Sequence, residues 1–432
     1  MASAPVVSVV PVVSHSKTSP AEEISDREVA AEDVIKQYEF MKLASEPSER
    51  PFIWPEATRP EILHNEYDID LPLIDLTPVL RLQSLRREIE EFKGDADEVR
   101  AARSGLEAQM KDCEAAKSDA EKMIRAACEE YGFFEIINSG IPMEVVEEFR
   151  KCCRQMFDLP LERKLKLTIN PSVEKPALGG YTPIKRKDAF SAMNPAYSWN
   201  EGFNVDSPVI PGRLEELADA LWPGEDSSTK GQALRSSAEE YGTHVNKVIF
   251  LLMDLIVGSL GIPEESVDNL MGDRQKQQLT ATLRAINYPK CEHPELTWGL
   301  HCHTDPDVIT LLHQDAVGGL QIRFKDGTWH GVRPKPGAFL VNCGDFLQAW
   351  TNGRFLSAEH QVVANEKIRR MSVAFFVYSY NNGVISPRPE FVDAEHPPRY
   401  KPFTTAEYVK AILERHGLGQ KRGEVLDKVF GI

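Results

Sequence analysis

The 432-residue chain lacks three features that would each assign it to a class of protein. Its seven cysteines are odd in number and form no C-x-x-C pair, which argues against a disulfide framework and a zinc–cysteine module. No stretch approaches the roughly 18 apolar residues of a membrane span. Basic residues are outnumbered, because 50 Lys and Arg stand against 66 Asp and Glu, a formal net charge of −16. We therefore expect neither nucleic acid nor membrane as a partner, but a small molecule, and a monomeric, cytoplasmic protein.

The N-terminal segment, residues 1–45, also lacks the marks of a targeting sequence. It begins MASAPVVSVVPVVSHSKTSP, without the basic start of a secretory signal or the arginines of a transit peptide, and its prolines disfavour a helix. We predict a disordered tail, with plastid targeting as the alternative.

The predicted secondary structure of the rest of the chain changes along its length. Residues 46–270 predict a mostly helical region, whereas residues 271–405 contain short strands of Val, Ile, Thr, Phe and Leu separated by D-G, K-P-G and N-G turns. Residues 406–432 predict a helical C-terminal tail. The fold class is therefore mixed α+β.

A charged insertion at about residues 80–123 interrupts the first of these regions. Leu82, Leu85 and Ile89 recur at spacings of three and four, which predicts amphipathic helix. Gly94 and Gly105 are expected to interrupt it and give a hairpin of two helices. The simpler interpretation is a solvated excursion packed on the body; the alternative is a docking or dimerising arm.

Three polar residues in the strand-rich region have the chemistry of metal ligands. In a β-strand, residues i and i+2 face the same side, so His303 and Asp305 can converge on one metal ion. His360, 57 residues further on (360 − 303), precedes Val362 and Val363 in another predicted strand and offers a third ligand. Two imidazoles and one carboxylate leave open positions on a metal and suit non-haem Fe(II) and O₂ chemistry.

A second group of residues can recognise a carboxylate. Arg370 and Ser372 share one face of the strand RRMSVAFFVYSY, and a buried guanidinium requires an anionic partner, which its planar fork matches in bidentate fashion. Tyr288 ends a neighbouring strand and can donate to the same carboxylate. A dicarboxylate co-substrate would satisfy this clamp.

With these residues the sequence resembles the plant-type Fe(II)/2-oxoglutarate-dependent dioxygenases, such as flavonol and anthocyanidin synthases and gibberellin oxidases. The likeness runs from about residue 53 to residue 403 and includes LPLIDL, RAACEEYGFFEIINSGIP, HTD and SAEHQVVANEKIRRMSVAFF. It implies a distorted double-stranded β-helix, or jelly roll, flanked by helices. It also implies Fe(II) on His303, Asp305 and His360, and 2-oxoglutarate on Arg370 and Ser372. O₂ would be consumed, with ascorbate as reductant.

The sequence departs from the family pattern in three places. The usual N-x-Y-P appears as Ile286-Asn287-Tyr288-Pro289, so the expected Asn is either replaced by Ile286 or shifted to Asn287; Asn287 and Tyr288 are both candidates for binding the co-substrate. The usual N-H-G appears as Asn138-Ser139-Gly140. The charged insertion is longer than the family's usual linker.

Neighbouring polar residues have simpler interpretations. We expect His301 to be a strand-start or pocket residue, Asp307 a loop residue after Pro306, His313 solvated or hydrogen-bonded, and Cys302 a small core residue. His330 and His396 lie beside turns and are expected at the surface.

The substrate is the least determined feature. Phe376 and Tyr378 continue the Arg370 face, and Tyr181, Trp199 and Phe203 belong to a Gly/Pro-rich loop; these five are candidates for a pocket that binds a flavonoid, terpenoid (gibberellin) or alkaloid. Ordinary core packing is the alternative for each.

Three other functions remain open. One is a jelly-roll binding protein or receptor with a non-catalytic metal site, another a zinc hydrolase, and a less favoured one is 1-aminocyclopropane-1-carboxylate oxidation without 2-oxoglutarate. The expected reaction is hydroxylation or desaturation of a small metabolite with release of succinate and CO₂.

Overall fold

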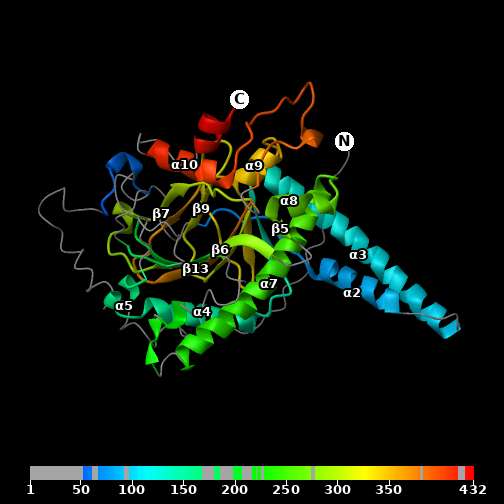
Figure 1. The fold of residues 1–432 in the computed structure, drawn as a ribbon, viewed down its shortest axis with the longest axis horizontal. Helices are drawn as coiled ribbons and strands as arrows, with labels where there is room; N and C mark the ends of the chain where they lie inside the picture. Colours follow the sequence, from blue (N-terminus) through cyan, green and yellow to red (C-terminus); the bar gives the residue numbers. More distant parts are fainter. Residues whose placement is uncertain are drawn as a thin grey trace, which may run out of the picture.

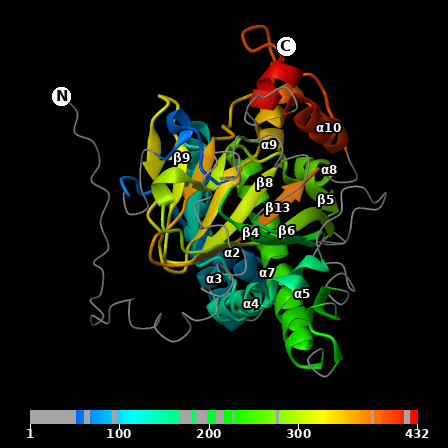
Figure 2. The same cartoon turned by 90° about the vertical axis from the view of Figure 1, so that its left-hand side faces the viewer.

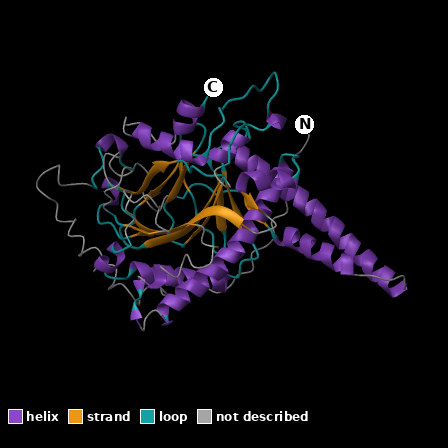
Figure 3. Cartoon of the chain, in the orientation of Figure 1, coloured by secondary structure: helices purple, strands orange, loops and turns teal. Residues whose placement is uncertain are grey.

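The structure is a computed structural model, and it describes residues 52–60, 67–91, 97–167, 180–184, 198–206, 217–219, 221–224, 228–273, 278–379, 383–416 and 424–432. The predicted tail, residues 1–45, lies outside the described residues. In Figure 3 the strands gather at the centre of the molecule and the helices surround them. Among the described residues, no helix combines the length and the apolar character that crossing a membrane requires.

The described strands form two sheets. The large sheet has the order β1-β2-β11-β8-β13-β6-β4-β3, with β5 paired to β6, and the small sheet has the order β10-β9-β12-β7. The strands are β1 (Leu73–Asp75), β2 (Phe133–Ile137), β3 (Gly180–Thr182), β4 (Glu201–Asp206), β5 (Gly272–Asp273), β6 (Gln278–Tyr288), β7 (Trp298–His303), β8 (Ile309–Gln314), β9 (Leu320–Arg323), β10 (Trp329–Gly331), β11 (Phe339–Cys343), β12 (His360–Val363) and β13 (Arg370–Tyr378).

The two sheets face each other across an apolar layer. Ile286 and Leu340 of the large sheet belong to the same buried cluster as Leu320, Ile322 and Val362 of the small sheet. Burying apolar side chains between two sheets is what closes a jelly roll. The predicted fold class, a mixed α+β chain with a jelly-roll core flanked by helices, is confirmed.

Helices cover the other face of the large sheet. In Figures 1 and 2, α4 and α7 run beneath β6 and β13, and the alternate residues Ala281, Leu283 and Ala285 of β6 belong to the largest core together with residues of these helices. The helices are α2 (Thr77–Glu91), α3 (Asp97–Glu130), α4 (Met143–Phe157), α5 (Leu161–Leu165), α7 (Lys230–Ser259), α8 (Asp268–Met271), α9 (Asp345–Trp350) and α10 (Thr405–His416). Short helical turns are η2 (Glu56–Thr58), η5 (Glu264–Val267), η6 (Pro294–Leu296), η8 (Pro389–Phe391) and η10 (Leu426–Phe430). Because both faces of the large sheet are covered, its central strands β8, β11 and β13 are almost entirely buried.

The charged insertion forms two helices that project from the body as an arm, seen at the right of Figure 1. The prediction that Gly105 interrupts the second helix is wrong, since α3 runs through it from Asp97 to Glu130. A single exposed glycine costs only about 1 kcal/mol in a helix, and flanking ion pairs such as Arg103–Glu107 (3.0 Å) support α3. Gly94 lies outside the described residues.

His313, expected to be solvated or hydrogen-bonded, is instead buried in the helix-covered face of the large sheet. Its side chain is 4% exposed, its ring packs 5.1 Å from that of Phe339, and its Nδ1 has no hydrogen-bond partner within the described part of the chain. Burial, reinforced by Arg150, lowers the pKa of His313 to about 3. The imidazole is therefore neutral in the folded protein.

This histidine makes stability depend on pH. The folded-state pKa of about 3 lies below the unfolded value of about 6.5, so the stabilisation is complete above pH 6.5 and is lost as the pH falls towards 3. Between pH 7 and pH 5 the wild type should lose about 2 kcal/mol relative to His313→Leu, which has no proton to gain. Urea unfolding at both pH values measures the difference, and parallel losses in the two proteins would contradict this assignment.

Candidate active site

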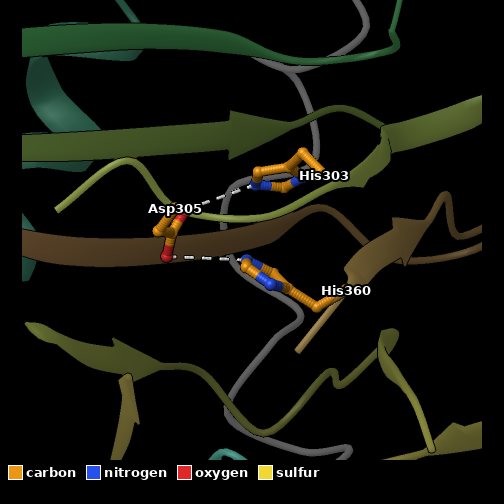
Figure 4. A group of neighbouring side chains, drawn as sticks. All are labelled: His303, Asp305 and His360. Carbon is orange, nitrogen blue, oxygen red and sulfur yellow. Dashed lines mark ion pairs between the residues drawn. The ribbon is translucent and has the colours of Figure 1, made fainter. Parts of the chain in front are cut away.

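Three ligand-type side chains converge where β7 and β12 pair. His303 is the last residue of β7, His360 is the first of β12, and the two are direct antiparallel partners. Asp305 lies two residues beyond the end of β7, not within the strand as expected, and reaches back between them (Figure 4). Its Oδ1 lies 3.6 Å from His303 Nε2 and its Oδ2 lies 3.7 Å from His360 Nε2. All three ligand atoms fall within 4.8 Å of one another, so the group could hold one metal ion.

The backbone fixes which nitrogen of each histidine faces this point. His303 Nδ1 lies 2.8 Å from the carbonyl oxygen of His301, and His360 Nδ1 lies 3.1 Å from that of Ala358. A carbonyl can only accept, so each Nδ1 carries the proton and each Nε2 presents its lone pair. Both imidazoles are thus held in the tautomer that a metal requires.

Two side chains that the sequence analysis missed orient the carboxylate. Thr310 Oγ1 of β8 and Asn342 Nδ2 of β11 each donate to Asp305 Oδ2 at 2.9 Å. Thr310 Oγ1 also lies 2.8 Å from Asp307 Oδ2. Burial and the nearby Asp305 carboxylate hold the pKa of Asp307 well above its usual range. Asp307, fully buried beside Gly344, is therefore disfavoured in its charged form.

The segment between the ligands is anchored by a buried carboxyl group on α9. Asp345 Oδ2 accepts hydrogen bonds from Thr304 Oγ1 at 3.1 Å and from Tyr408 Oη at 2.6 Å, and the Asp345 N–H donates to the Asp305 carbonyl at 2.8 Å. Burial raises the pKa of Asp345 to about 6, and its hydrogen bonds oppose this rise. The loop that carries Asp305 is thereby fixed on both sides.

The candidate carboxylate clamp occupies the inner face of the large sheet. Arg370 is 2% exposed; its Nη2 donates to Gln314 Oε1 at 2.9 Å, its Nη1 to Ser372 Oγ at 3.4 Å, and its guanidinium lies 4.7 Å from the centre of the Tyr288 ring. Arg370 Nε has no hydrogen-bond partner within the described residues. Gln314 lies on the same side of β8 as Thr310, the residue that holds Asp305, so clamp and metal ligands face one interior.

Asn287, a candidate for the same clamp, faces away from it. Its Nδ2 donates to Glu201 Oε1 at 2.8 Å and its Oδ1 accepts from Arg369 Nε. It is adjacent to Tyr288 on β6, and successive residues of a strand face opposite sides of the sheet. The structure therefore brings Tyr288, and not Asn287, to Arg370.

The five candidate substrate residues fall into two groups. Tyr181 and Phe203 are 0% and 1% exposed in the largest core, and Trp199 is 3% exposed in a separate cluster, where its Nε1 donates to the carbonyls of Pro289 and Lys290. Packing alone accounts for these three, and they are not carried into the substrate site. Phe376 and Tyr378 are half-buried and continue the strand face of Arg370 and Ser372.

The remaining polar candidates have local partners. His301 Nδ1 lies 2.9 Å from Ser198 Oγ and its ring stacks on Trp54 with centroids 5.7 Å apart. His330 pairs with Asp68 and His396 with Asp393, and Cys302 is half-buried.

Comparison with known proteins places this geometry in a class. The sequence model of the 2OG-Fe(II) oxygenase superfamily matches residues 279–379, and that of the "non-haem dioxygenase in morphine synthesis N-terminal" region matches residues 106–225. The chain belongs to the 2OG-Fe(II) oxygenase superfamily and is an oxidoreductase of the dioxygenase type whose family uses Fe(II) and 2-oxoglutarate. The resemblance inferred from the sequence is confirmed.

Individual relatives are plant oxygenases. Jasmonate-induced oxygenase 4 of Arabidopsis thaliana is 33% identical over 72% of this chain and 82% of its own length. A feruloyl CoA ortho-hydroxylase of Ipomoea batatas is 35% identical over 68% of this chain and 76% of its own length. The crystal structure of JOX2 in complex with 2OG, Fe and JA superposes with a TM-score of 0.63 at 27% identity, covering 90% of this chain and 94% of that one.

The hydrogen bonds to Asp305 should control metal affinity. Asn342→Leu keeps the side-chain size but removes one donor to Oδ2, so affinity for Mn(II) should fall about 10- to 100-fold. Calorimetric titration with Mn(II) measures this. Gln321→Leu on β9, which removes the buried hydrogen bond to Gln361 of β12, is the matched control and should bind Mn(II) as the wild type does. Equal affinities in all three proteins would refute the role of Asn342.

Proposed function

We propose that His303, Asp305 and His360 hold Fe(II), and that Arg370, Ser372 and Tyr288 bind the distal carboxylate of 2-oxoglutarate during oxidation of a small organic metabolite. The observation that carries this proposal is the state of Arg370. Within the described part of the chain, no carboxylate forms an ion pair with this guanidinium, although it is 2% exposed and its Nε lacks a partner. A dicarboxylate would supply the missing anion.

The burial of Arg370 favours a carboxylate ligand. Burying an unpaired guanidinium costs several kcal/mol, and Gln314, Ser372 and the Tyr288 ring compensate only in part because none carries a negative charge. The planar fork of Arg370 offers parallel N–H donors to a carboxylate. Arg370 and its neighbours are therefore suited to bind a charged, planar group and not an apolar one.

The chemistry of the three metal-ligand side chains likewise fits ferrous iron. Two imidazoles whose Nε2 atoms face Asp305 and one oriented carboxylate leave positions open to co-substrate and O₂. When bound, iron would supply the oxidative decarboxylation of 2-oxoglutarate to succinate and CO₂, and ascorbate would serve to keep it reduced. The chain's own task is to fix the ligands, exclude water from the interior and hold the metabolite in one orientation.

The substrate would meet the inner face of β13 beyond the clamp. Phe376 and Tyr378 lie on that face and are half-buried, and an aromatic surface of this kind suits a flavonoid, terpenoid or alkaloid scaffold. The names of the relatives refer to jasmonate and feruloyl CoA, which are likewise small organic molecules. We propose hydroxylation or desaturation as the outcome. We also propose a monomer in the cytoplasm, because an odd number of cysteines without a C-x-x-C pair favours a reducing compartment.

Two alternatives make different use of the same residues. A jelly-roll receptor would bind its ligand without turnover, and a zinc hydrolase would need the metal ligands but no buried arginine. The absence of an ion-pair partner for Arg370 among the described residues favours the oxygenase over both.

The direct test is formation of succinate from 2-oxoglutarate by the full-length protein loaded with Fe(II) and ascorbate, with and without a pool of plant metabolites. Succinate that rises with one compound would identify the substrate, and His360→Ala should abolish it. A receptor or a hydrolase would form none under any of these conditions.

If Arg370 binds the co-substrate, its mutation should weaken the binding of 2-oxoglutarate but not that of the metal ion. Arg370→Lys replaces a fork by a point charge and loses one charge-assisted hydrogen bond, about 1.5–3 kcal/mol, so the apparent KM for 2-oxoglutarate should rise about 10- to 100-fold. Affinity for Mn(II) should change less than threefold. Arg323→Lys, at the surface pair with Glu359 (2.6 Å), is the matched control. Equal losses of co-substrate and metal affinity in Arg370→Lys would indicate misfolding and not a clamp.

A further inference from the structure

A second set of buried charges lies behind the clamp, on the helix-covered face of the large sheet. Lys164 of α5 and Glu201, the first residue of β4, are both 0% exposed, with Nζ and Oε2 2.8 Å apart. Lys164 Nζ also donates to the Phe157 carbonyl at 2.8 Å, and Tyr181 Oη donates to the same Glu201 oxygen.

Asn287 joins this pair to a second one. Its Nδ2 donates to Glu201 Oε1 at 2.8 Å and its Oδ1 accepts from Arg369 Nε, while Arg369 Nη1 donates to Asp158 at the end of α4. Only this orientation of the amide offers a donor to the carboxylate and an acceptor to the guanidinium. These five residues, Lys164, Glu201, Asn287, Arg369 and Asp158, are called the outer network below.

The charges of the outer network are paired, whereas the clamp has no anion among the described residues. Two cations face two anions, and Lys164, Glu201 and Asn287 are at least nine-tenths buried. A buried charge left without its partner is strongly destabilising, so each member restricts where the others can lie. A network of this kind constrains position more than it adds stability.

The network is attached to the clamp through the backbone. Asn287 precedes Tyr288, the last residue of β6, and Arg369 precedes Arg370, the first residue of β13; Tyr288 and Arg370 are direct antiparallel partners. Strand ends are where pairing frays. The Asn287–Arg369 hydrogen bond joins the two strand ends on the helix-covered face of the sheet. The clamp residues Tyr288 and Arg370 point to the opposite, inner face.

We infer that the outer network positions Arg370 and Tyr288 for 2-oxoglutarate, with Asn287 and Arg369 as positioning residues that touch no co-substrate. The inference rests on the proposed function. A bidentate carboxylate site must hold its donors within about 0.5 Å of the productive geometry, and a free strand end does not. The tandem arginines therefore divide two tasks: Arg370 binds and Arg369 aligns.

A merely structural network would behave differently on mutation. Losing buried hydrogen bonds lowers the melting temperature wherever they lie, but only a positioning network links that loss to co-substrate affinity. The discriminating quantity is the dissociation constant of 2-oxoglutarate, measured apart from turnover.

The experiment uses the full-length protein loaded with Ni(II), which binds 2-oxoglutarate without turnover, and calorimetric titration with 2-oxoglutarate. Asn287→Ala should weaken 2-oxoglutarate binding about tenfold and leave the affinity for Ni(II) within threefold of the wild type. Arg369→Met should weaken it similarly, and Arg369→Lys, which retains one donor and the charge, should recover most of the affinity. Gln321→Ala, which breaks the buried Gln321–Gln361 amide pair (2.9 Å), should lower the melting temperature without changing 2-oxoglutarate affinity.

The outcomes separate the two proposals. If the wild type binds 2-oxoglutarate and the Asn287 and Arg369 variants bind it equally well, the positioning role is wrong while the proposed function stands. Equal weakening by Gln321→Ala would likewise overturn the positioning role, because the effect would then be general instability. A wild type that binds no 2-oxoglutarate overturns both. If Asn287→Ala does not fold, the Met and Lys variants of Arg369, whose side chain is 20% exposed, decide the question.

Discussion

The antiparallel pairing of β12 with β7 is the constraint on which the active site depends. It places His360 directly opposite His303 although 57 residues separate them in the chain (360 − 303). A slip of one residue would turn His360 to the other face of the small sheet, because side chains alternate along a strand. The register is held from the other side by β9, where Ile322 lies opposite His360 in the apolar layer. The register of β12 on β7 shifts just after His360, so the regular pairing that positions this ligand is confined to the His360–His303 pair itself.

The two faces of the large sheet provide different electrostatic environments. On its inner face Arg370 has polar neighbours but no anion among the described residues, and on its outer face Lys164, Glu201, Arg369 and Asp158 neutralise one another. The difference is chemically useful. A site that must accept a charged ligand needs an unmatched charge, and an unmatched buried charge is tolerable only where rigid surroundings prevent it from turning to water.

Part of this site was accessible from the sequence because its signals are local. The H-T-D triplet, the later His360 and the alternation of Arg370 with Ser372 each depend on neighbours within a few residues. The sequence is less informative where tertiary contacts decide. Tyr181 and Phe203 come from a stretch rich in Gly and Pro, which gives no indication that both are core residues. Asn287 was assigned to the clamp through the family pattern, although strand alternation with Tyr288 already places it on the opposite face. Thr310 and Gln314 could have been found, since they share a strand face four residues apart, but Asn342 carries no local signal at all.

Helix α10 is linked to the metal loop through one carboxyl group, that of Asp345. Tyr408 of α10 and Thr304, which lies between two of the candidate ligands, both donate to Asp345 Oδ2, and the Asp345 N–H holds the Asp305 carbonyl. Aromatic contacts of Tyr408 with Phe346 (5.3 Å) and Phe403 (5.2 Å) fix the helix at this point. Burial raises the pKa of Asp345 to about 6, and the hydrogen bonds from Tyr408 and Thr304 oppose this rise. Helix α10 therefore contributes to the geometry of Asp305 without approaching the ligands itself, and the jelly roll is completed by a segment outside its own strands.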